Sequence, residues 1–541
     1  MRSRALIVFA ALSGALVSGG WLLQRGFDRD DSVYTRARMF DAVMGHIARD
    51  YVDSLETPEL YRHAVDGLLE ELRDPYTVYL APDRLRRLSE STTGTYGGIG
   101  IQIDVRDGWI VVVTPLPGTP AEKAGIQFGD RVIAIDGKST RGWTQEEASK
   151  ALRGKKGSRL TLTIERPGVT EQLPFVLQRD DIHVRVVRHP LLLTDKVGYL
   201  DVNLFSESTA AELRTEIGRL RNRGMKMLIL DMRTNPGGLL EQGVEVSDIF
   251  LDRGQKIVTM QGRARGTTRE FVDETAQLWP DMPIIALVNG SSASATEIVA
   301  GALQDHDRAV IVGSTTYGKG SAQSVLRLSD GGALKLTTAR WFTPSGRSIA
   351  RPSFDDSDDG ADGAPPPEGE QPLSEREKFR TDAGRTVYGG GGITPDLIVG
   401  APDSVPAELA FSRALGRDIP RFRDALTDYA LSVKASRTVT SPDFVVTPEM
   451  REELWQRVTR RGIDVPRIFY DSAQSLITRL IGYEVARYVF GPEAEFQRQV
   501  KNDRVIATAL SLAARANTQK ELLARAAEQR AAKREDVPSS P

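Results

Sequence analysis

The sequence predicts a multidomain α/β protein, and three observations carry that prediction. The chain has 541 residues, more than one hydrophobic core usually holds. Between residues 181 and 400, apolar strands alternate with amphipathic helices, a pattern typical of βα units on a largely parallel sheet. Residues 91–180 are β-rich instead, and both ends of the chain have helical periodicity. We therefore expect an α/β core, a small β-module before it, and helical segments on either side.

The first 26 residues predict export. Met1 to Arg4 is basic, and Ala5 to Leu23 is an uncharged, mostly apolar run that is just long enough to span a bilayer. No clear Ala-x-Ala cleavage site follows, so we favour an uncleaved anchor over a cleaved signal peptide and over a buried core helix. Because the positive charges precede the span, the bulk of the chain is expected on the periplasmic face of the inner membrane.

Three further segments are distinguished by their periodicity and composition. Residues 27–90 have apolar residues at helical spacing and predict a helical N-terminal segment. Residues near 353–384 are rich in Asp, Gly and Pro and predict a disordered insertion in the core. Residues 401–541 are helical again, and their role is open. Assembly into a homo-oligomer and partner binding are the alternatives to simple scaffolding.

Composition argues against several classes of function. The formal net charge is −2, so the chain lacks the excess of basic residues that nucleic-acid binding favours. The chain has no cysteine, which rules out disulfides and thiolate zinc sites, and its five histidines form no close cluster in the sequence. We expect neither a metal nor a cofactor.

The β-rich module opens on Gly97-Gly98-Ile99-Gly100, directly before a strand that begins at Ile101. A glycine turn at this place can aim backbone N–H groups at a carboxylate, and the strand edge can accept an extended peptide. The alternative is a purely structural turn. Together with the run from Pro117 to Gly137, this stretch resembles a PDZ domain. The resemblance implies that residues 97–101 bind the C-terminus of a peptide, one that ends in apolar residues because Ile99 and Ile101 flank the turn.

The stretch from Val310 to Gln323 admits two readings. Gly313, Gly318 and Lys319 have the spacing of a phosphate-binding loop, with Asp231 as the acid that closes a neighbouring strand. However, Gly320 stands where Mg²⁺ needs a hydroxyl, and the strand of Asp231 precedes the loop instead of following it. We therefore rank a nucleotide site below the other reading.

The other reading begins at Ser294, which follows the predicted strand 284–288 and opens a helix. A hydroxyl there lies at the positive end of the helix, where N–H groups can stabilise an oxyanion. Ser294 and Glu297 also form a capping-box pattern, and on this motif alone a cap is favoured. A cap needs only one serine, whereas this loop also has Ser291 and Ser292 among small residues.

A serine nucleophile needs a base to accept its proton. His306 is the only histidine nearby in the sequence, and we prefer to read it as a helix-end residue. Lys319 can serve if burial keeps its amine neutral. Gln323, four residues further on, can orient that amine by a hydrogen bond.

Five ordered motifs look like those of the carboxyl-terminal processing peptidases, also called tail-specific proteases. The motifs are Asn289–Glu297, Ile298–Asp305, Tyr317–Gln323, Thr338–Ile349 and Gly392–Asp396, and Arg73–Leu80 resembles the segment before the PDZ domain in that family. The resemblance implies a serine peptidase with a Ser/Lys dyad, a crotonase-like α/β core and a PDZ domain that acts as a lid. Departures are mild: Thr296 stands where Ser is frequent, and Trp341-Phe342 where two tyrosines are.

Carried over by position, the resemblance implies that Ser294 is the nucleophile, Lys319 the general base and Gln323 its support. The Asn235–Gly238 turn would offer the N–H of Gly237 or Gly238 to the oxyanion, with the N–H of Ala295 as second donor. The implied function is an exported endopeptidase that recognises protein C-termini through its PDZ domain. A non-catalytic PDZ scaffold on a peptidase-like core is the competing class.

Overall fold

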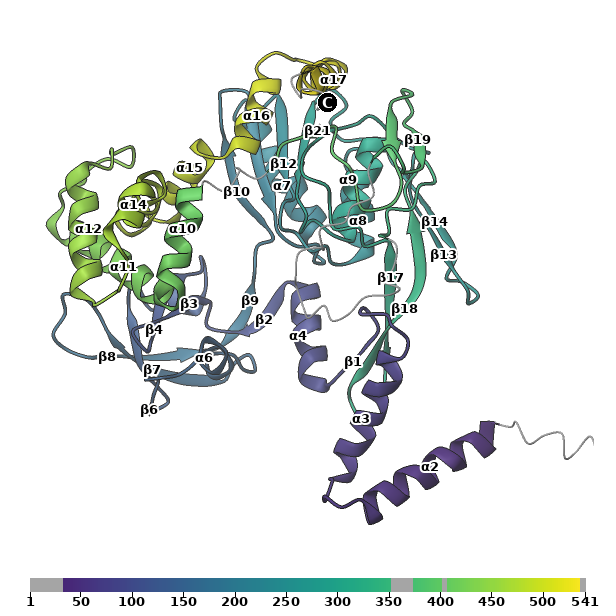
Figure 1. Cartoon of the computed structure of the whole chain (residues 1–541), viewed down its shortest axis with the longest axis horizontal. Coiled ribbons are helices and arrows are strands. Elements are labelled where there is room, and N and C mark those ends of the chain that lie inside the picture. The colour runs from purple at the N-terminus through teal and green to yellow at the C-terminus, as the bar shows by residue number, and fades with distance from the viewer. Residues whose placement is uncertain (1–32, 352–372, 401–405, 536–541) are drawn as a thin grey trace, which may run out of the picture. The chain divides into compact units, whose positions relative to one another are not determined.

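The computed structural model describes residues 33–351, 373–400 and 406–535 (Figure 1). The chain divides into two compact units. The smaller unit holds the residues up to Asp83 together with Gln323–Thr337, and the larger unit holds the rest. The predicted export segment, residues 1–26, lies outside the described residues. None of the helices in the described ranges has the length and apolar content that a membrane crossing requires.

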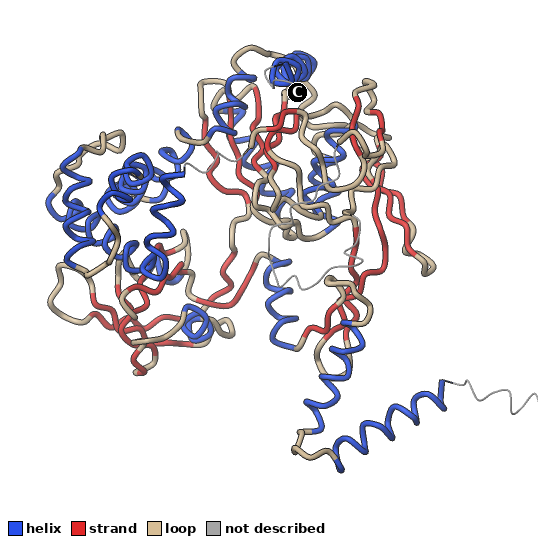
Figure 2. Tube along the Cα trace, in the orientation of Figure 1, coloured by secondary structure: helices blue, strands red, loops and turns tan. Residues whose placement is uncertain are grey.

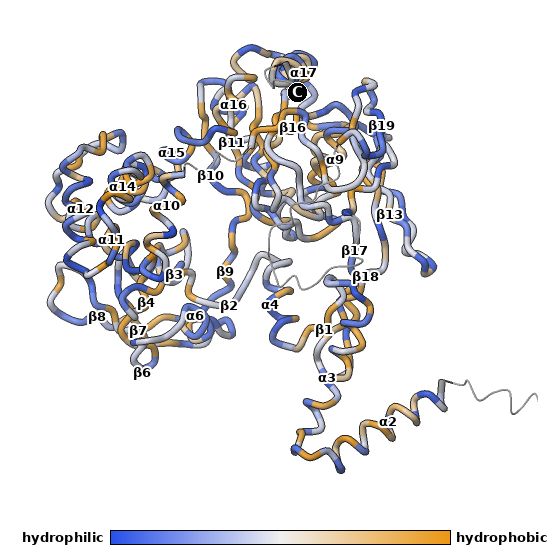
Figure 3. The backbone as a smooth tube through the Cα atoms, viewed as in Figure 1, coloured by the Kyte–Doolittle hydropathy of each residue, from blue (hydrophilic) through white to orange (hydrophobic). Residues whose placement is uncertain are grey.

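The smaller unit consists of two helices and a short sheet. Helices α2 (Val33–Asp50) and α3 (Thr57–Glu70) have the form that their periodicity predicts. Apolar and polar residues alternate along α2, as an amphipathic helix requires (Figure 3). Strand β1 (Val78–Leu80) pairs antiparallel with the first part of β18 (Ala333–Phe342).

The β-rich module of the larger unit is an antiparallel sheet closed by short helices. Its sheet has the strand order β3-β4-β5-β7-β8, with β6 paired to β5, so β3 is an edge strand. The strands are β3 (Ile101–Arg106), β4 (Trp109–Pro115), β5 (Arg131–Ile135), β6 (Lys138–Ser139), β7 (Arg159–Glu165) and β8 (Leu173–Gln178); the helices are α5 (Pro120–Lys123) and α6 (Gln145–Leu152). Helix α4 (Pro82–Thr93) precedes the module and has no buried residue. A separate two-stranded ribbon, formed by β2 (Thr95–Gly98) and β9 (Asp180–His183), connects the module to the residues that follow it in the larger unit.

The core of the larger unit is a sheet, whose strands are among those drawn in red in Figure 2. Its strand order is β10-β11-β12-β15-β16-β21. All neighbours from β11 to β21 are parallel, and only the edge strand β10 is antiparallel. This confirms the predicted α/β class. The strands are β10 (Val187–Leu192), β11 (Val197–Val202), β12 (Met227–Asp231), β15 (Ile284–Val288), β16 (Val310–Gly313) and β21 (Leu397–Ile398); the helices between them are α7 (Thr209–Asn222), α8 (Leu240–Asp248) and α9 (Ala295–Asp305).

The two faces of this sheet are covered by helices from different parts of the chain. Side chains alternate along each strand, so Leu228 and Leu230 pack in one cluster with residues of α7, α8 and α9. Met227 and Ile229 point the other way and pack with Ile506, Leu512 and Leu522. Those residues belong to α16 (Arg504–Ala513) and α17 (Gln519–Glu535), which contact β16 and β21. The boundary predicted at residue 400 therefore does not separate the core from the C-terminal region.

A second sheet and a hairpin complete the core. Strand β13 (Lys256–Gly262) pairs with β14 (Arg269–Val272) and with the second part of β18. Strand β17 (Ser321–Arg327), most of which belongs to the smaller unit, also pairs with β18. Strands β19 (Lys378–Arg380) and β20 (Thr386–Tyr388) form an antiparallel hairpin. The insertion predicted near 353–384 therefore extends too far, because residues 373–384 are described and enter this hairpin. Residues 352–372 lie outside the described ranges.

The remaining C-terminal helices form a bundle with its own apolar cluster. Its members are α10 (Pro406–Leu415), a 3-10 turn (Gly416–Asp418), α11 (Ile419–Ser436), α12 (Pro448–Arg460), α13 (Arg467–Ser472) and α14 (Gln474–Phe490), and α15 (Pro492–Lys501) leads from α14 to α16. The bundle contacts the β-rich module: the Arg106 guanidinium donates to the Thr427 hydroxyl at 2.8 Å and to the Tyr488 hydroxyl. The Phe128 ring packs edge-on against Tyr488, with ring centroids 4.2 Å apart.

Candidate active site

Ser294 lies between strand β15 and helix α9, at the end of the 289–294 loop. Its backbone has φ 57° and ψ −117°, a combination that non-glycine residues rarely adopt. Such strain costs roughly 1–3 kcal/mol and persists only where neighbouring contacts impose it, often at functional sites. The other two serines of the loop differ: Ser292 is buried and donates to the carbonyl of Met232 at 2.8 Å, and Ser291 is exposed.

The 232–239 loop, which follows strand β12, packs directly on Ser294. A Cβ atom on Gly237 would lie 2.6 Å from the Ala293 carbonyl oxygen and 2.8 Å from the Ser294 Cβ, so only glycine fits. The Asn235 carbonyl accepts hydrogen bonds from the Ala293 N–H and the Thr296 hydroxyl, both at 3.0 Å. These contacts hold the 232–239 loop against the start of α9.

The structure distinguishes the two glycines proposed as oxyanion donors. The Gly237 N–H donates to Asn235 Oδ1 at 2.9 Å. The N–H groups of Gly238 and Ala295 have no hydrogen-bond partner among the described residues. Gly238 is fixed by its neighbours, because a Cβ there would lie 2.1 Å from the Phe205 carbonyl oxygen. Of the two glycines, Gly238 is therefore the one with an N–H group open to a ligand.

Glu297, one turn into α9, joins the backbone of Ser294 to the loop that carries Lys319. Its side chain has no exposed surface. One oxygen, Oε2, accepts the N–H of Ser294 at 2.8 Å and the N–H of Lys319 at 2.9 Å; Oε1 accepts the Thr316 hydroxyl at 2.5 Å and the Gly318 N–H at 2.7 Å. Burial raises the pKa of the Glu297 carboxyl, and the four donors act against that rise. The predicted capping-box acid thus reaches beyond its own helix.

The surroundings of Lys319 argue against a phosphate-binding loop. The N–H groups of Gly318 and Lys319, which such a loop would present to phosphate, donate to Glu297. Asp231 accepts from the Tyr199 hydroxyl at 2.8 Å and from the Arg233 guanidinium at 2.6 Å. The glycines allow close packing as predicted, since a Cβ on Gly320 would lie 2.9 Å from the Ala350 Cβ.

His306 and Gln323, which the sequence also singled out, have other surroundings. His306 ends α9, at the opposite end from Ser294, where its ring contacts the Asp382 carboxylate and the Lys256 carbonyl, each at 2.7 Å. This agrees with its reading as a helix-end residue. Gln323 belongs to strand β17 in the smaller unit, where its amide donates to the Thr337 hydroxyl at 3.2 Å.

The five predicted peptide-binding residues divide into two groups. Gly97 and Gly98 lie in strand β2 and pair with Asp181 and Asp180 of β9. The turn itself is therefore Ile99 and Gly100. Ile99 is buried in the core of the β-rich module with its carbonyl accepting from Ala121, so its side chain is not a surface for a ligand.

The edge strand β3 and helix α6 lie side by side in this module. Gly100 has φ +77°, which turns the chain into β3, and Ile101 is partly buried against the module's core. The Gln145 amide, at the start of α6, donates to the Ile103 carbonyl of β3 at 3.1 Å. An edge strand flanked by a helix is the geometry that strand addition of a peptide requires.

The described residues of the larger unit form two clefts, and the first adjoins the 232–239 loop. One of about 310 Å³ opens beside the end of β12 and is lined by residues that include Arg188, Asp201 and Arg233. Burial, together with the charge of Asp231, raises the pKa of Asp201 to about 6, although Arg188 acts to lower it. Across the described ranges, no group of three His, Asp or Glu side chains is arranged to hold a metal.

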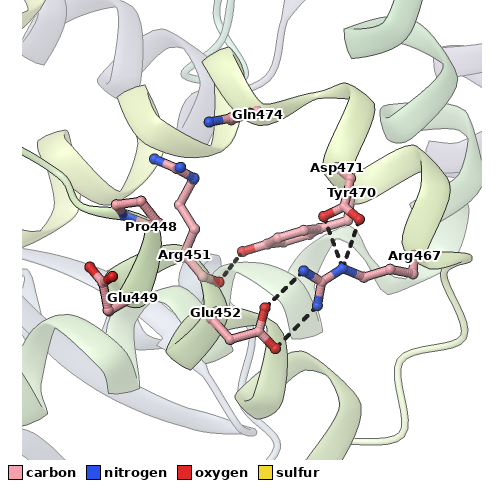
Figure 4. Close-up of a pocket in the computed structure, with 8 residues that line it drawn as sticks. All are labelled: Pro448, Glu449, Arg451, Glu452, Arg467, Tyr470, Asp471 and Gln474. Atoms are coloured by element: carbon pink, nitrogen blue, oxygen red, sulfur yellow. Dashed lines mark hydrogen bonds and ion pairs between the residues drawn. The ribbon is translucent and has the colours of Figure 1, made fainter.

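The other cleft, of about 440 Å³, lies among α12, α13 and α14 (Figure 4). Three of its charged side chains pair with one another: Arg467 contacts Glu452 at 2.8 Å and Asp471 at 2.9 Å. The Tyr470 hydroxyl donates to the Arg451 carbonyl at 2.7 Å. These ion pairs stay within the bundle.

Comparison with known proteins places these features in a family. Residues 196–355 match the model of peptidase family S41, and residues 88–165 match the PDZ domain. The carboxy-terminal-processing protease of Bartonella bacilliformis is 39% identical over 326 residues, which cover 60% of this chain and 74% of that protein. The chain belongs to peptidase family S41. The family model spans Ser294 and Lys319 but ends before the C-terminal helices.

Two other matches belong to the same class. The carboxy-terminal processing protease CtpA of Bacillus subtilis is 37% identical over 303 residues, covering 56% of this chain and 64% of that protein. A solved structure of a photosystem II D1 C-terminal processing protease is 27% identical with a TM-score of 0.36, over 70% of this chain and 90% of that one.

Sequence reasoning missed how this S41 site is held together. It read Glu297 only as a cap. The signal for a wider role is its position in the helix start Ala295–Leu303, where every other residue except Thr296 is apolar and a buried carboxylate needs several donors. It also gave no role to Arg233 or to Asp503, whose side chains meet at 2.8 Å. No local pattern predicts that contact, because the two residues are far apart in the chain.

Proposed function

We propose that this S41 peptidase is a serine endopeptidase that binds the C-terminus of a protein substrate through its PDZ domain and cleaves through an acyl-enzyme on Ser294. The relatives described above are named carboxy-terminal processing proteases. The observation that carries the proposal is the pair of hydrogen bonds from the N–H groups of Ser294 and Lys319 to one buried oxygen of Glu297. Both backbones are thereby held at one point beside α9.

In the proposed reaction the Ser294 hydroxyl attacks the scissile carbonyl carbon while the uncharged amine of Lys319 accepts the hydroxyl proton. The carbonyl oxygen becomes an oxyanion, which the open N–H groups of Gly238 and Ala295 stabilise. Lys319 then gives the proton to the leaving amine, and water releases the acyl group from Ser294. For Gln323 we retain the role that the family resemblance implies, support of the lysine amine. No step requires a cofactor.

The PDZ domain is proposed to take the substrate's C-terminal residues as an added strand on β3. The terminal carboxylate would lie at the Ile99-Gly100 turn, and the next residues would run along the edge from Ile101. Gln145 would then release the Ile103 carbonyl to a peptide N–H, because the two donors compete for one acceptor.

The first test is cleavage of an unfolded reporter protein with an apolar C-terminus, without added nucleotide or metal. We expect the unmodified chain to cut and Ser294→Ala and Lys319→Ala to lose activity by at least about a thousandfold, since each removes a reacting group. Ser291→Ala, in the same loop but exposed, is the matched control and should keep full activity. Cleavage by Ser294→Ala at the unmodified rate would refute the proposed nucleophile.

We also propose that the segment before residue 27 carries the chain across the inner membrane, on the sequence pattern alone. A reporter enzyme that is active only outside the cytoplasm, fused after residue 60, should be active. An inactive but intact fusion would contradict export.

A further inference from the structure

An ion pair joins the C-terminal helices to the 232–239 loop of the active site. Arg233 Nη1 lies 2.8 Å from Asp503 Oδ2. Asp503 is also the N-cap of α16: its Oδ1 accepts the N–H groups of Val505 at 2.8 Å and Ile506 at 3.0 Å. The two oxygens of this carboxylate therefore do different things, since one caps a helix and the other holds an arginine of the catalytic domain.

The charges around Arg233 are largely shielded from solvent. Its side chain is 20% exposed, that of Asp231 is 5% exposed and that of Asp503 is 25% exposed. The guanidinium contacts both oxygens of Asp231, with Nε at 2.9 Å and 3.0 Å. One arginine is thus shared between two carboxylates that come from distant parts of the chain. Charge-assisted contacts of this kind, partly out of water, hold geometry better than exposed pairs do.

Arg233 lies near the start of the loop that leads to Gly238, directly after Met232, whose N–H donates to the Leu287 carbonyl at 2.9 Å. The next residue, Thr234, has φ +58°, and its N–H donates to Asn289 Oδ1 at 2.9 Å. Asn289 begins the loop of Ser294. Asn235 follows, with its amide donating to the Val202 carbonyl at 2.8 Å. A strained residue directly after Arg233 stays in place only if the contacts on both sides hold it.

We propose that Asp503 is a positioning residue for the 232–239 loop, so that the C-terminal helices complete the active site from outside the segment matched by the family model. The inference rests on the proposed function of that loop. Through Arg233, Asp503 fixes where the Gly238 N–H points. It touches neither substrate nor reacting atoms.

The test is Asp503→Asn in the full chain. Asparagine keeps an oxygen that can cap α16 but places an amide NH₂ opposite Arg233, so the ion pair is lost while the cap remains. We expect kcat on the unfolded reporter to fall about tenfold, because small misplacements of catalytic groups are costly. KM should stay within about twofold, because the loop faces the transition state and not the PDZ-bound end of the substrate.

The matched control is Glu452→Gln, which removes the exposed ion pair with Arg467 inside the bundle and should leave kcat unchanged. Asp503→Glu should restore most of the activity. The double variant Arg233→Gln/Asp503→Asn should be no slower than Arg233→Gln alone, because both changes break the same contact. If Asp503→Asn folds poorly, two measurements still show whether Asp503 positions the loop: kcat calculated per folded molecule, and the comparison of the double variant with Arg233→Gln.

An unchanged kcat per folded molecule in Asp503→Asn would overturn the inference, as would additive losses in the double variant. Ser294→Ala separates this failure from failure of the proposed function. If Ser294→Ala is inactive while Asp503→Asn is fully active, only the positioning role is wrong. If Ser294→Ala is active, the proposed function itself fails.

Discussion

Glu297 accepts four hydrogen bonds at a position with no exposed surface. A carboxylate is suited to this place because it accepts at both oxygens and donates at neither. The donors come from the start of α9 and from the loop of Lys319, so a single side chain fixes the relative position of both backbones. Those donors offset part of the cost of burying its charge, and burial still leaves the pKa of the Glu297 carboxyl raised.

Glu297→Gln should therefore impair the site more than its small change in volume suggests. If the amide NH₂ faces Ser294 and Lys319, it meets two backbone N–H donors. If it faces Gly318 and Thr316, it meets one N–H donor and a hydroxyl that must turn from donating to accepting. Each stranded buried donor costs about 1–3 kcal/mol. We expect kcat/KM on the reporter to fall at least about a hundredfold. Glu216→Gln is the control, since Glu216 is also buried but pairs with Arg219 of its own helix. Equal losses in both variants would show that Glu297 has no special role in holding the loops.

At the scale of elements, the parallel sheet needs helices from two distant parts of the chain. Successive residues of a strand point to opposite faces, and both faces of β12 are apolar. Helices α7, α8 and α9 come from the connections between strands, as in other parallel sheets. The second face is covered by α16 and α17, so these helices belong to the fold of the peptidase core.

Leu522→Ala tests that covering role. Leu522 is fully buried in the cluster that joins α17 to the sheet. Removing its side chain should lower the free energy of unfolding by about 2–5 kcal/mol, the range for large-to-small changes in a core. Leu409→Ala on α10, where the side chain is 40% exposed, should cost far less. Urea unfolding measures both, and equal small losses would mean that α17 does not pack on the sheet in solution.

At the scale of the whole molecule, the C-terminal region does two things within the larger unit. Its last helices cover the peptidase sheet, and its bundle contacts the PDZ domain through Arg106, Phe128 and Tyr488. Charged groups surround that contact: Arg461 pairs with Asp107 at 3.2 Å and with Asp428. Asp424 lies close to Asp107, and burial together with that neighbouring charge raises the pKa of Asp424 to about 6.

This raised pKa predicts how stability changes with pH. The Asp424 carboxyl binds its proton more tightly in the folded protein than in the unfolded chain. Its charged form therefore disfavours folding fully above about pH 6, and this penalty fades as the pH falls from about 6 to about 4, the ordinary carboxyl range. Asp424→Asn should raise the melting temperature at about pH 7.5 and change it much less at about pH 4. Asp443→Asn, whose carboxyl has its pKa lowered by Lys501, should raise it at neither pH. A stabilisation of Asp424→Asn that is equal at both pH values would contradict this account.

The sequence by itself determined the fold class, the order of strands and helices in the core, the PDZ module and the family motifs around Ser294 and Lys319. These follow from local causes: side-chain periodicity, helix-start residues, and glycines that allow close backbone approach. Only the tertiary structure decided that the Gly237 N–H is occupied while that of Gly238 is open, that Glu297 joins two loops, and that α16 and α17 cover the sheet. The tertiary structure also decided that Arg233 pairs with Asp503. These features depend on contacts between residues far apart in the chain, or on the direction in which one N–H group points. Such contacts and directions leave no periodic or local signal in the sequence.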